Sequence, residues 1–100
     1  MEAKFSKDAE NDICSLITYG LSTYGEIVAQ TYFSELSDCF ESLAENPLIA
    51  PLCLRQNNKI RRFVFRAHVI YFAIYPPTIL VLRVLHQRQD PIIEFIDSTL

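Results

Sequence analysis

The chain has 100 residues, a formal net charge of −3 and a hydrophobic content of 50%, which is enough apolar material for the core of one domain. No apolar run reaches the roughly 18 residues that a membrane-spanning helix needs, and residues 1–8 lack the apolar segment of a secretory signal. The three cysteines, Cys14, Cys39 and Cys53, are widely spaced and odd in number, a pattern typical of reduced thiols rather than of a zinc or redox site. We therefore expect a single cytoplasmic domain over residues 1–100, with no membrane association, metal or other cofactor.

Charge is strongly segregated along the chain. Residues 1–45 carry nine acidic and two basic side chains, whereas residues 46–89 carry seven basic side chains and no acidic one. The remaining residues, 90–100, add three acids. Segregation of this kind informs about partners more than about fold. It predicts that the basic part meets something anionic: nucleic acid, an acidic protein tail or the acidic helices of the chain itself.

The first elements expected are a short strand and a helix. A strand at residues 3–5 would give the N-terminal phenylalanine a sheet to join. Ser6 is a suitable N-cap for a helix that starts at Lys7 with two acids in its first turn. Apolar residues then recur at helical spacing, and the helix is expected to end at Gly20 or as late as Ser22.

A second helix should follow directly. Residues 23–26, Thr-Tyr-Gly-Glu, have the form of a capping box and predict that the helix begins there. Its end is predicted at Asn46-Pro47, because a residue that precedes proline is disfavoured in the helical region. Together the two helices would form an antiparallel hairpin. The apolar row of the second helix is Ala29, Phe33, Leu36, Phe40 and Leu43, widened by Tyr32.

Beyond Pro47 the pattern changes to that of strands. Residues 59–66 and 68–75 mix β-branched and aromatic residues with arginines, and residues 78–85 are almost continuously apolar, as in a strand buried on both faces. Residues 75–78 supply one turn, and Ala67-His68 is expected to be a tighter joint, bend or bulge. The order β-α-α-β-β-β predicts an α+β fold, with the helical hairpin on one face of a mainly antiparallel sheet.

The strand at residues 59–66 has no clean apolar face. Arg61 and Arg62 must point to opposite sides of the sheet, so at least one should lie near the helices. Partners there would be Glu35, Asp38 or Glu41. The strand is either part of an anion-binding surface or a solvated edge with one internal ion pair, and the sequence leaves both readings open.

Two histidines raise the question of catalysis. His68 or His86, with Arg83 nearby, has the residue types of a ribonuclease: histidine as general acid or base and arginine on the phosphate. The simpler interpretation is that His86 ends a strand and hydrogen-bonds a backbone group or Asp90. No glutamate occurs in residues 46–89, and a phosphate-binding glycine loop is excluded because Gly20 and Gly25 are the only glycines.

Aromatic residues lie among the basic strands. Tyr71, Phe72 and Tyr75 could act as stacking platforms for bases. Their strand spacing favours a core position for Phe72 and leaves Tyr71 and Tyr75 open.

Taken in order, several fragments resemble one family: residues 5–13, 24–26, 40–47, 60–63, 68–72 and 79–90. They are similar to the corresponding segments of the ParE toxins of bacterial toxin–antitoxin modules, within the RelE/ParE superfamily. The most specific fragment is 83–90. The chain departs from the family at Ile49-Ala50-Pro51, where a glycine is common, and at Pro76-Pro77, where the turn is usually polar or contains glycine.

The resemblance implies a cytoplasmic toxin that inhibits DNA gyrase, has no enzymatic activity and is neutralised by a ParD-like antitoxin. It also implies a possible higher-order hetero-oligomer with the antitoxin, and contact with DNA only through the antitoxin. The alternative is a ribosome-dependent mRNA endoribonuclease of the RelE branch, because Arg83 and His86 are retained.

Two sets of site residues follow from these expectations. The antitoxin should bind the groove between the helical hairpin and the sheet and the basic strands, at Ile17, Leu21, Val28, Tyr32, Arg61, Arg62, Arg66 and Arg83. The surface that faces the target should include Arg83, His86, Arg88 and Phe95.

Two further expectations concern the C-terminal half. Arg83, among aliphatic neighbours, should pair with Asp90, Glu94 or a helix carboxylate. The segment 90–100 should dock as a turn or short helix beside the sheet edge, with Phe95 as its anchor.

Overall fold

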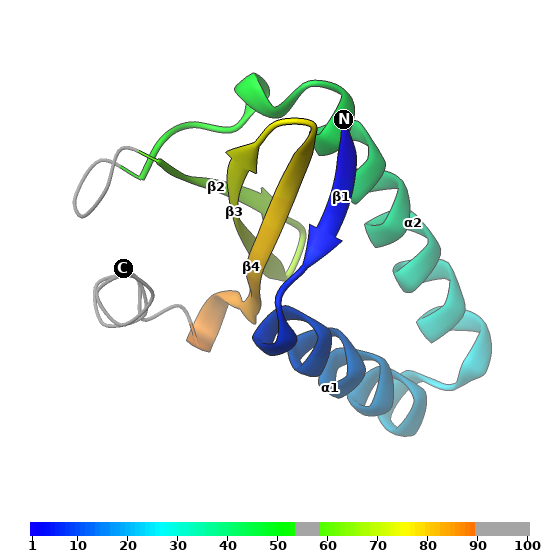
Figure 1. The fold of residues 1–100 in the computed structure, drawn as a ribbon. Helices are drawn as coiled ribbons and strands as arrows, with labels where there is room; N and C mark the ends of the chain where they lie inside the picture. Colours follow the sequence, from blue (N-terminus) through cyan, green and yellow to red (C-terminus); the bar gives the residue numbers. More distant parts are fainter. Residues whose placement is uncertain (54–58, 90–100) are drawn as a thin grey trace.

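The computed structural model describes residues 1–53 and 59–89 (Figure 1). The elements follow the predicted order. They are β1 (Glu2–Phe5), α1 (Lys7–Tyr24), α2 (Glu26–Glu45), β2 (Ile60–Phe65), β3 (His68–Tyr75) and β4 (Thr78–His86), with 3-10 turns at Pro47–Ile49 and Gln87–Gln89. The predicted α+β class and its order β-α-α-β-β-β are therefore confirmed.

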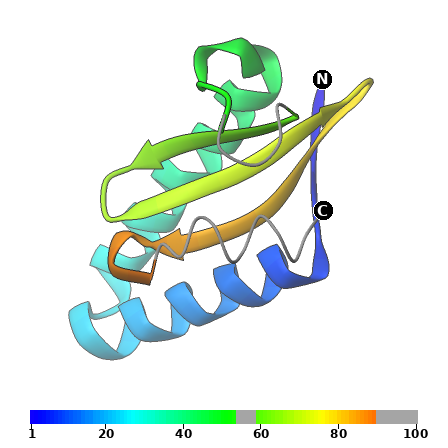
Figure 2. The same cartoon turned by 90° about the vertical axis from the view of Figure 1, so that its left-hand side faces the viewer.

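The four strands form one mixed sheet in the order β1-β4-β3-β2. β1 is parallel to β4, whereas the pairs β2–β3 and β3–β4 are antiparallel. Both helices pack on one face, α1 against β4 and α2 against β1. Figure 1 shows α1 extending away from the end of β4 and α2 returning beside β1, and Figure 2 shows the helices behind and beneath the strands.

Ser6 joins the start of α1 to the sheet. Its hydroxyl oxygen accepts the Ala9 backbone N–H at 3.0 Å, as the predicted N-cap requires. The same hydroxyl donates to the Leu82 carbonyl of β4 at 2.8 Å. One side chain thus caps the helix and fixes its first turn against a central strand.

The predicted end of α1 is wrong. The helix continues through Gly20 and Ser22 to Tyr24, and the joint is Gly25, whose φ of 86° lies in the region that favours glycine. Gly20 instead lies where the helices approach each other: a Cβ built there would be 3.5 Å from the Cβ of Ala29.

The predicted capping box is also wrong. α2 begins at Glu26 after Gly25, with no side-chain cap hydrogen bond. Thr23 belongs to the last turn of α1, whose hydrogen bonding extends to the Gly25 N–H donating to the Leu21 carbonyl at 3.2 Å. A residue inside one helix cannot cap the next, so the T-x-x-E match carries no structural meaning here.

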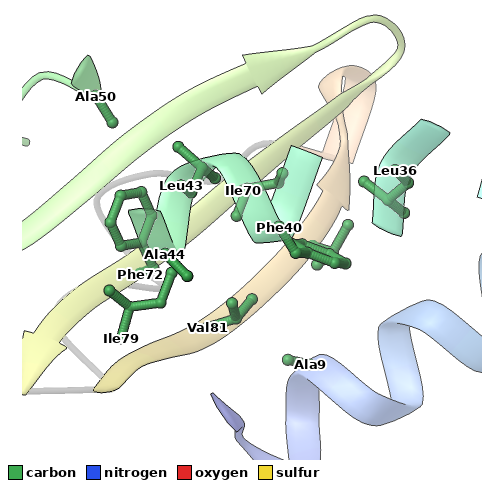
Figure 3. Close-up of a cluster of buried hydrophobic side chains, with 11 residues drawn as sticks. Ala9, Leu36, Phe40, Leu43, Ala44, Ala50, Ile70, Phe72, Ile79 and Val81 are labelled. Atoms are coloured by element: carbon green, nitrogen blue, oxygen red, sulfur yellow. The ribbon is translucent and has the colours of Figure 1, made fainter. Parts of the chain in front are cut away.

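The main core lies between α2 and the sheet (Figure 3). Leu36, Phe40 and Leu43 of the predicted apolar row are buried against strand residues. The row's earlier members are not: Phe33 is 38% exposed, because this half of α2 extends past the sheet toward the hairpin joint. Burying apolar surface stabilises a fold by about 25 cal/mol per Å². The C-terminal half of α2, where the buried side chains lie, therefore contributes more to the packing of the hairpin on the sheet than the N-terminal half does.

Apolar residues are buried on the opposite face of the sheet as well. Val69, Tyr71 and Leu85 belong to this second cluster, together with Ile60 and Cys53. β4 is buried on the face toward the helices, whereas on the other face Leu85 is buried and Leu82 half-buried, so the predicted burial on both faces is confirmed in part. Tyr71 is a core residue, whereas Tyr75 is 54% exposed at the turn.

The tight joint predicted at Ala67-His68 is a two-residue turn, and the sheet has a separate bulge that was not predicted. Arg66 and Ala67 form the β2–β3 turn, with Arg66 at a φ of 50°. A register shift in the β3–β4 ladder lies elsewhere, between Tyr71 and Phe72, which oppose Arg83 and Val81 and leave Leu82 as the extra residue. Such a bulge re-aims the strand beyond it.

Candidate partner-binding surfaces

The joint end of the helical hairpin carries exposed apolar side chains. We call Tyr19, Leu21, Tyr24, Ile27, Val28 and Phe33 the hairpin tip. Ile27 is 82% exposed and Val28 53%, and the rings of Tyr19 and Tyr24 meet edge to face at 6.3 Å. Large apolar side chains that are exposed near one joint are candidates for an interaction site.

The four apolar residues predicted to contact the antitoxin on the helical hairpin differ in exposure. Leu21 and Val28 are exposed at the hairpin tip, whereas Ile17 and Tyr32 are half-buried nearer the sheet. Within each helix the two residues are four apart and share one face. The predicted residues therefore run from the tip toward the sheet along both helices.

The predicted arginines have specific partners, although not the ones expected. Arg66 forms a two-fold ion pair with Glu35 of α2, with Nη1–Oε1 at 2.7 Å and Nη2–Oε2 at 2.9 Å. Arg61 instead donates to the Ala50 carbonyl at 2.7 Å, and Arg62 Nε donates to the Tyr71 hydroxyl at 3.3 Å. Glu35 thus pairs with the arginine at the turn rather than with Arg61 or Arg62, because Arg66 lies at the end of β2 that α2 reaches.

Arg83 is held by a helix carboxylate, one of the three partners predicted. Its Nε and Nη2 donate to the two oxygens of Asp12 at 2.7 and 2.9 Å, and the Val84 N–H also donates to Asp12 at 2.9 Å. These bonds to Asp12 raise the pKa of Arg83. The other candidates, Asp90 and Glu94, lie outside the described residues, as does the predicted docking of segment 90–100 with Phe95.

A cluster of titratable rings was not anticipated from the sequence. The Tyr32 hydroxyl oxygen lies 2.6 Å from His68 Nδ1, and the rings of His68 and His86 meet edge to face at 5.5 Å. His86 Nδ1 accepts the Arg88 N–H at 3.1 Å, which leaves the proton on Nε2. Burial lowers the pKa of His68, helped by its neighbour His86, and raises the pKa of Tyr32.

The proximity of His68 and His86, although not that of Tyr32, could have been approximated from the sequence. The hairpin turn at residues 75–78 sets the β3–β4 register, which would oppose His68 to Leu85. The bulge shifts the register by one residue and brings His68 opposite His86. The contribution of Tyr32 has no sequence signal, because it depends on how α2 crosses the sheet.

The remaining chemistry of the described residues is limited. Within residues 1–53 and 59–89, no group of three or more His, Cys, Asp or Glu side chains is placed to hold a metal ion. Cys14 is exposed, Cys39 is half-buried and Cys53 is buried. No helix in the described part of the chain is long and apolar enough to cross a membrane.

The fold and these surfaces define a small α+β protein in which a helical hairpin with an exposed apolar tip covers one face of a sheet rich in arginine. The family model described as "ParE toxin of type II toxin-antitoxin system, parDE" matches residues 3–91, so this chain belongs to the ParE toxin family. The family resemblance of the sequence fragments is confirmed.

A solved structure shares the fold. It is described as "Chromosomal ParDE TA system from P. aeruginosa", and the chain superposes on it with a TM-score of 0.73 at 14% sequence identity. The match covers 86% of this chain and 95% of that chain. No curated protein sequence matches the chain.

Proposed function

We propose that this toxin acts in the cytoplasm by inhibiting DNA gyrase and that a ParD-like antitoxin neutralises it. The observation that carries the proposal is the family match over residues 3–91. The surfaces agree with a protein that works by binding: an exposed apolar hairpin tip, and basic strands beside acidic helices. Contact with DNA would come through the antitoxin, in a toxin–antitoxin hetero-oligomer.

The antitoxin would bind along the helical hairpin and over the basic strands. Leu21 and Val28 offer apolar anchors, with Ile17 and Tyr32 continuing toward the sheet. Arg66 is the most accessible of the predicted cations whose pairing is described, with a side chain 57% exposed beside Glu35. An acidic, partly disordered antitoxin segment would cover both parts and order on binding.

The surface toward gyrase would lie at the end of β4. Arg88 is exposed there and His86 half-buried, whereas the interaction of Arg83 with Asp12 gives it a structural role first. Phe95 remains a proposed member outside the described residues. Arg88→Ala should then reduce gyrase inhibition without affecting folding.

A supercoiling assay with purified gyrase tests the proposal. Added toxin should inhibit supercoiling, and the cognate antitoxin should restore it. Full gyrase activity with an excess of folded toxin would overturn the proposed target.

The second candidate function is ribosome-dependent mRNA cleavage, and the Tyr32–His68–His86 cluster is the observation that favours it. We propose instead that the protein is not an enzyme, because Arg83, the arginine that the sequence suggested for binding a phosphate, is engaged by Asp12. An mRNA-cleavage assay with ribosomes should show no product. Cleavage that disappears in His68→Phe or His86→Ala would establish the RelE-type activity.

A further inference from the structure

Among the strands of the described residues, β1 lies at an edge of the sheet and pairs only with β4. The Glu2 N–H bonds the Pro77 carbonyl at 3.2 Å and the Ser6 N–H bonds the Val81 carbonyl at 2.9 Å, so the even-numbered residues face β4. In a parallel ladder the alternate residues direct both backbone groups the other way. Ala3 and Phe5 therefore present their N–H and C=O groups to the outer edge, where no described element pairs with them.

A groove runs along this edge. It has a volume of about 430 Å³ and lies between β1 and one face of α2. Phe40 and Ala44 form its apolar part, and Ser37, Glu41 and Glu45 follow one another at four-residue steps along its helical wall. Figure 1 shows α2 beside β1 over this stretch.

The charge of the groove is negative. Glu41 and Glu45 are exposed, four residues apart on one helix, and neither is paired with a basic side chain in the described part of the chain. Like charges at this spacing on a helix repel each other. The Glu2 carboxylate also lines the groove and is paired with Lys4 at 2.9 Å.

We propose that the outer edge of β1 and this acidic groove bind an extended, basic segment of a partner protein as an added strand. Backbone hydrogen bonds to Ala3 and Phe5 would supply the pairing, as in other cases of strand addition. Side chains two residues apart in a strand are separated by about 6.6 Å, close to the roughly 6.0 Å that four residues rise along a helix. Lysine or arginine at alternate positions would thus face Glu41 and Glu45.

A second copy of this chain does not fit the role. The other edge strand, β2, is basic, but its outer side is already bonded within the chain. The Arg62 N–H donates to the Pro51 carbonyl at 3.0 Å and the Cys53 N–H donates to the Ile60 carbonyl at 2.7 Å. The added strand is therefore not β2 of a second copy, and we take the partner to be a different protein with a basic segment; the inference stands independently of the proposed action on gyrase.

Two synthetic peptides test the inference. One is an eight-residue peptide of alternating valine and lysine, and its twin carries N-methyl groups on alternate backbone nitrogens, which removes strand pairing at equal charge. We expect saturable binding of the first peptide, with the largest amide chemical-shift changes at Ala3 and Phe5, and none of the second. Equal binding of both, or no saturation at millimolar peptide, would overturn the proposal.

Matched variants locate the site. Glu41→Lys should weaken binding of the valine–lysine peptide about fivefold or more. Asp38→Lys makes the same charge change on an exposed part of α2 outside the groove and should have a smaller effect. Ala3→Pro removes only an outward N–H, which an edge strand tolerates, and should abolish binding while the sheet stays folded. Equal effects of Glu41→Lys and Asp38→Lys would reduce the binding to general charge attraction and reject the site.

Discussion

At the scale of single residues, Asp12 links α1 to β4 through several hydrogen bonds. It accepts two hydrogen bonds from Arg83 and one from the Val84 N–H, and its side chain is only 14% exposed. Through these bonds one turn of α1 is fixed to the end of β4. The sequence predicted that Arg83 needs a carboxylate but could not select one, because the choice depends on which helical turn crosses the strand.

The first prediction concerns this contact. Asp12→Ala should lower the free energy of unfolding by about 2–3 kcal/mol, since it removes two charge-assisted hydrogen bonds from the half-buried Arg83 guanidinium and the acceptor of the Val84 N–H. Urea unfolding measures the loss. Glu10→Ala, an exposed acid of the same helix, is the control and should change stability by less than about 0.5 kcal/mol. Similar losses in both variants would contradict the role of Asp12.

The second prediction is a pH dependence from His68. Its pKa is lowered from 6.5 by burial and by His86, so the unfolded chain takes up a proton at higher pH than the folded chain. Stability contributed by the neutral imidazole is therefore complete above pH 6.5 and declines as the pH falls below that value. The groups facing it are Tyr32 from α2 and His86 from β4.

Unfolding in urea at pH about 7.5 and about 5.5 brackets the ordinary histidine pKa and measures this effect. The wild type should be less stable at the lower pH, and His68→Phe should show a smaller difference. His86→Phe separates the contribution of the second ring. An unchanged pH dependence in His68→Phe would show that other groups cause it.

At the scale of elements, burial patterns were predicted better than helix ends. The apolar run of β4 and the later members of the apolar row of α2, Leu36, Phe40 and Leu43, were predicted to form the core, and the structure buries them there. The hairpin joint was misplaced because Gly20 resembles a stop and residues 23–26 resemble a cap. Neither local signal ends α1, which continues through both segments to Tyr24. The joint is at Gly25, the glycine with a positive φ.

The third prediction uses the two glycines. Gly20→Ala should raise the free energy of unfolding by up to about 1 kcal/mol, because alanine is the better helix former and its Cβ would make an ordinary contact with Ala29. Gly25→Ala should lower it by about 1–2 kcal/mol, because the joint needs a φ of 86°. Thermal unfolding of both variants measures the effects. A loss of stability in Gly20→Ala would mean that the helices cannot accommodate the methyl group.

At the scale of the whole molecule, some of the acidic and basic residues that are separated along the sequence lie next to each other in the fold. Two of the basic residues meet acids of the helices, Arg66 with Glu35 and Arg83 with Asp12. The chain's own helices therefore account for part of the pattern that the sequence left open. Two surface features are not explained by these internal ion pairs: the apolar hairpin tip and the acidic groove beside β1. Leu21 and Val28 of the hairpin tip were among the predicted antitoxin contacts. Their position beyond the sheet was not predicted, because helical periodicity alone does not tell where the sheet beneath the helices ends.

The last prediction tests the hairpin tip as the antitoxin site and rests on the proposed function. Val28→Glu places a charge on a surface that antitoxin binding would bury, and should weaken the complex about tenfold or more, equivalent to roughly 1.4 kcal/mol. Leu48→Glu is the matched control, because Leu48 is also an exposed apolar residue, 69% accessible, but lies in the 3-10 turn after α2. Titration calorimetry with the cognate antitoxin measures both. Both variants should fold and inhibit gyrase like the wild type, since each position is exposed and distant in sequence from the end of β4. If Val28→Glu binds the antitoxin as tightly as Leu48→Glu does, the antitoxin leaves the hairpin tip uncovered and the basic strands become the principal site.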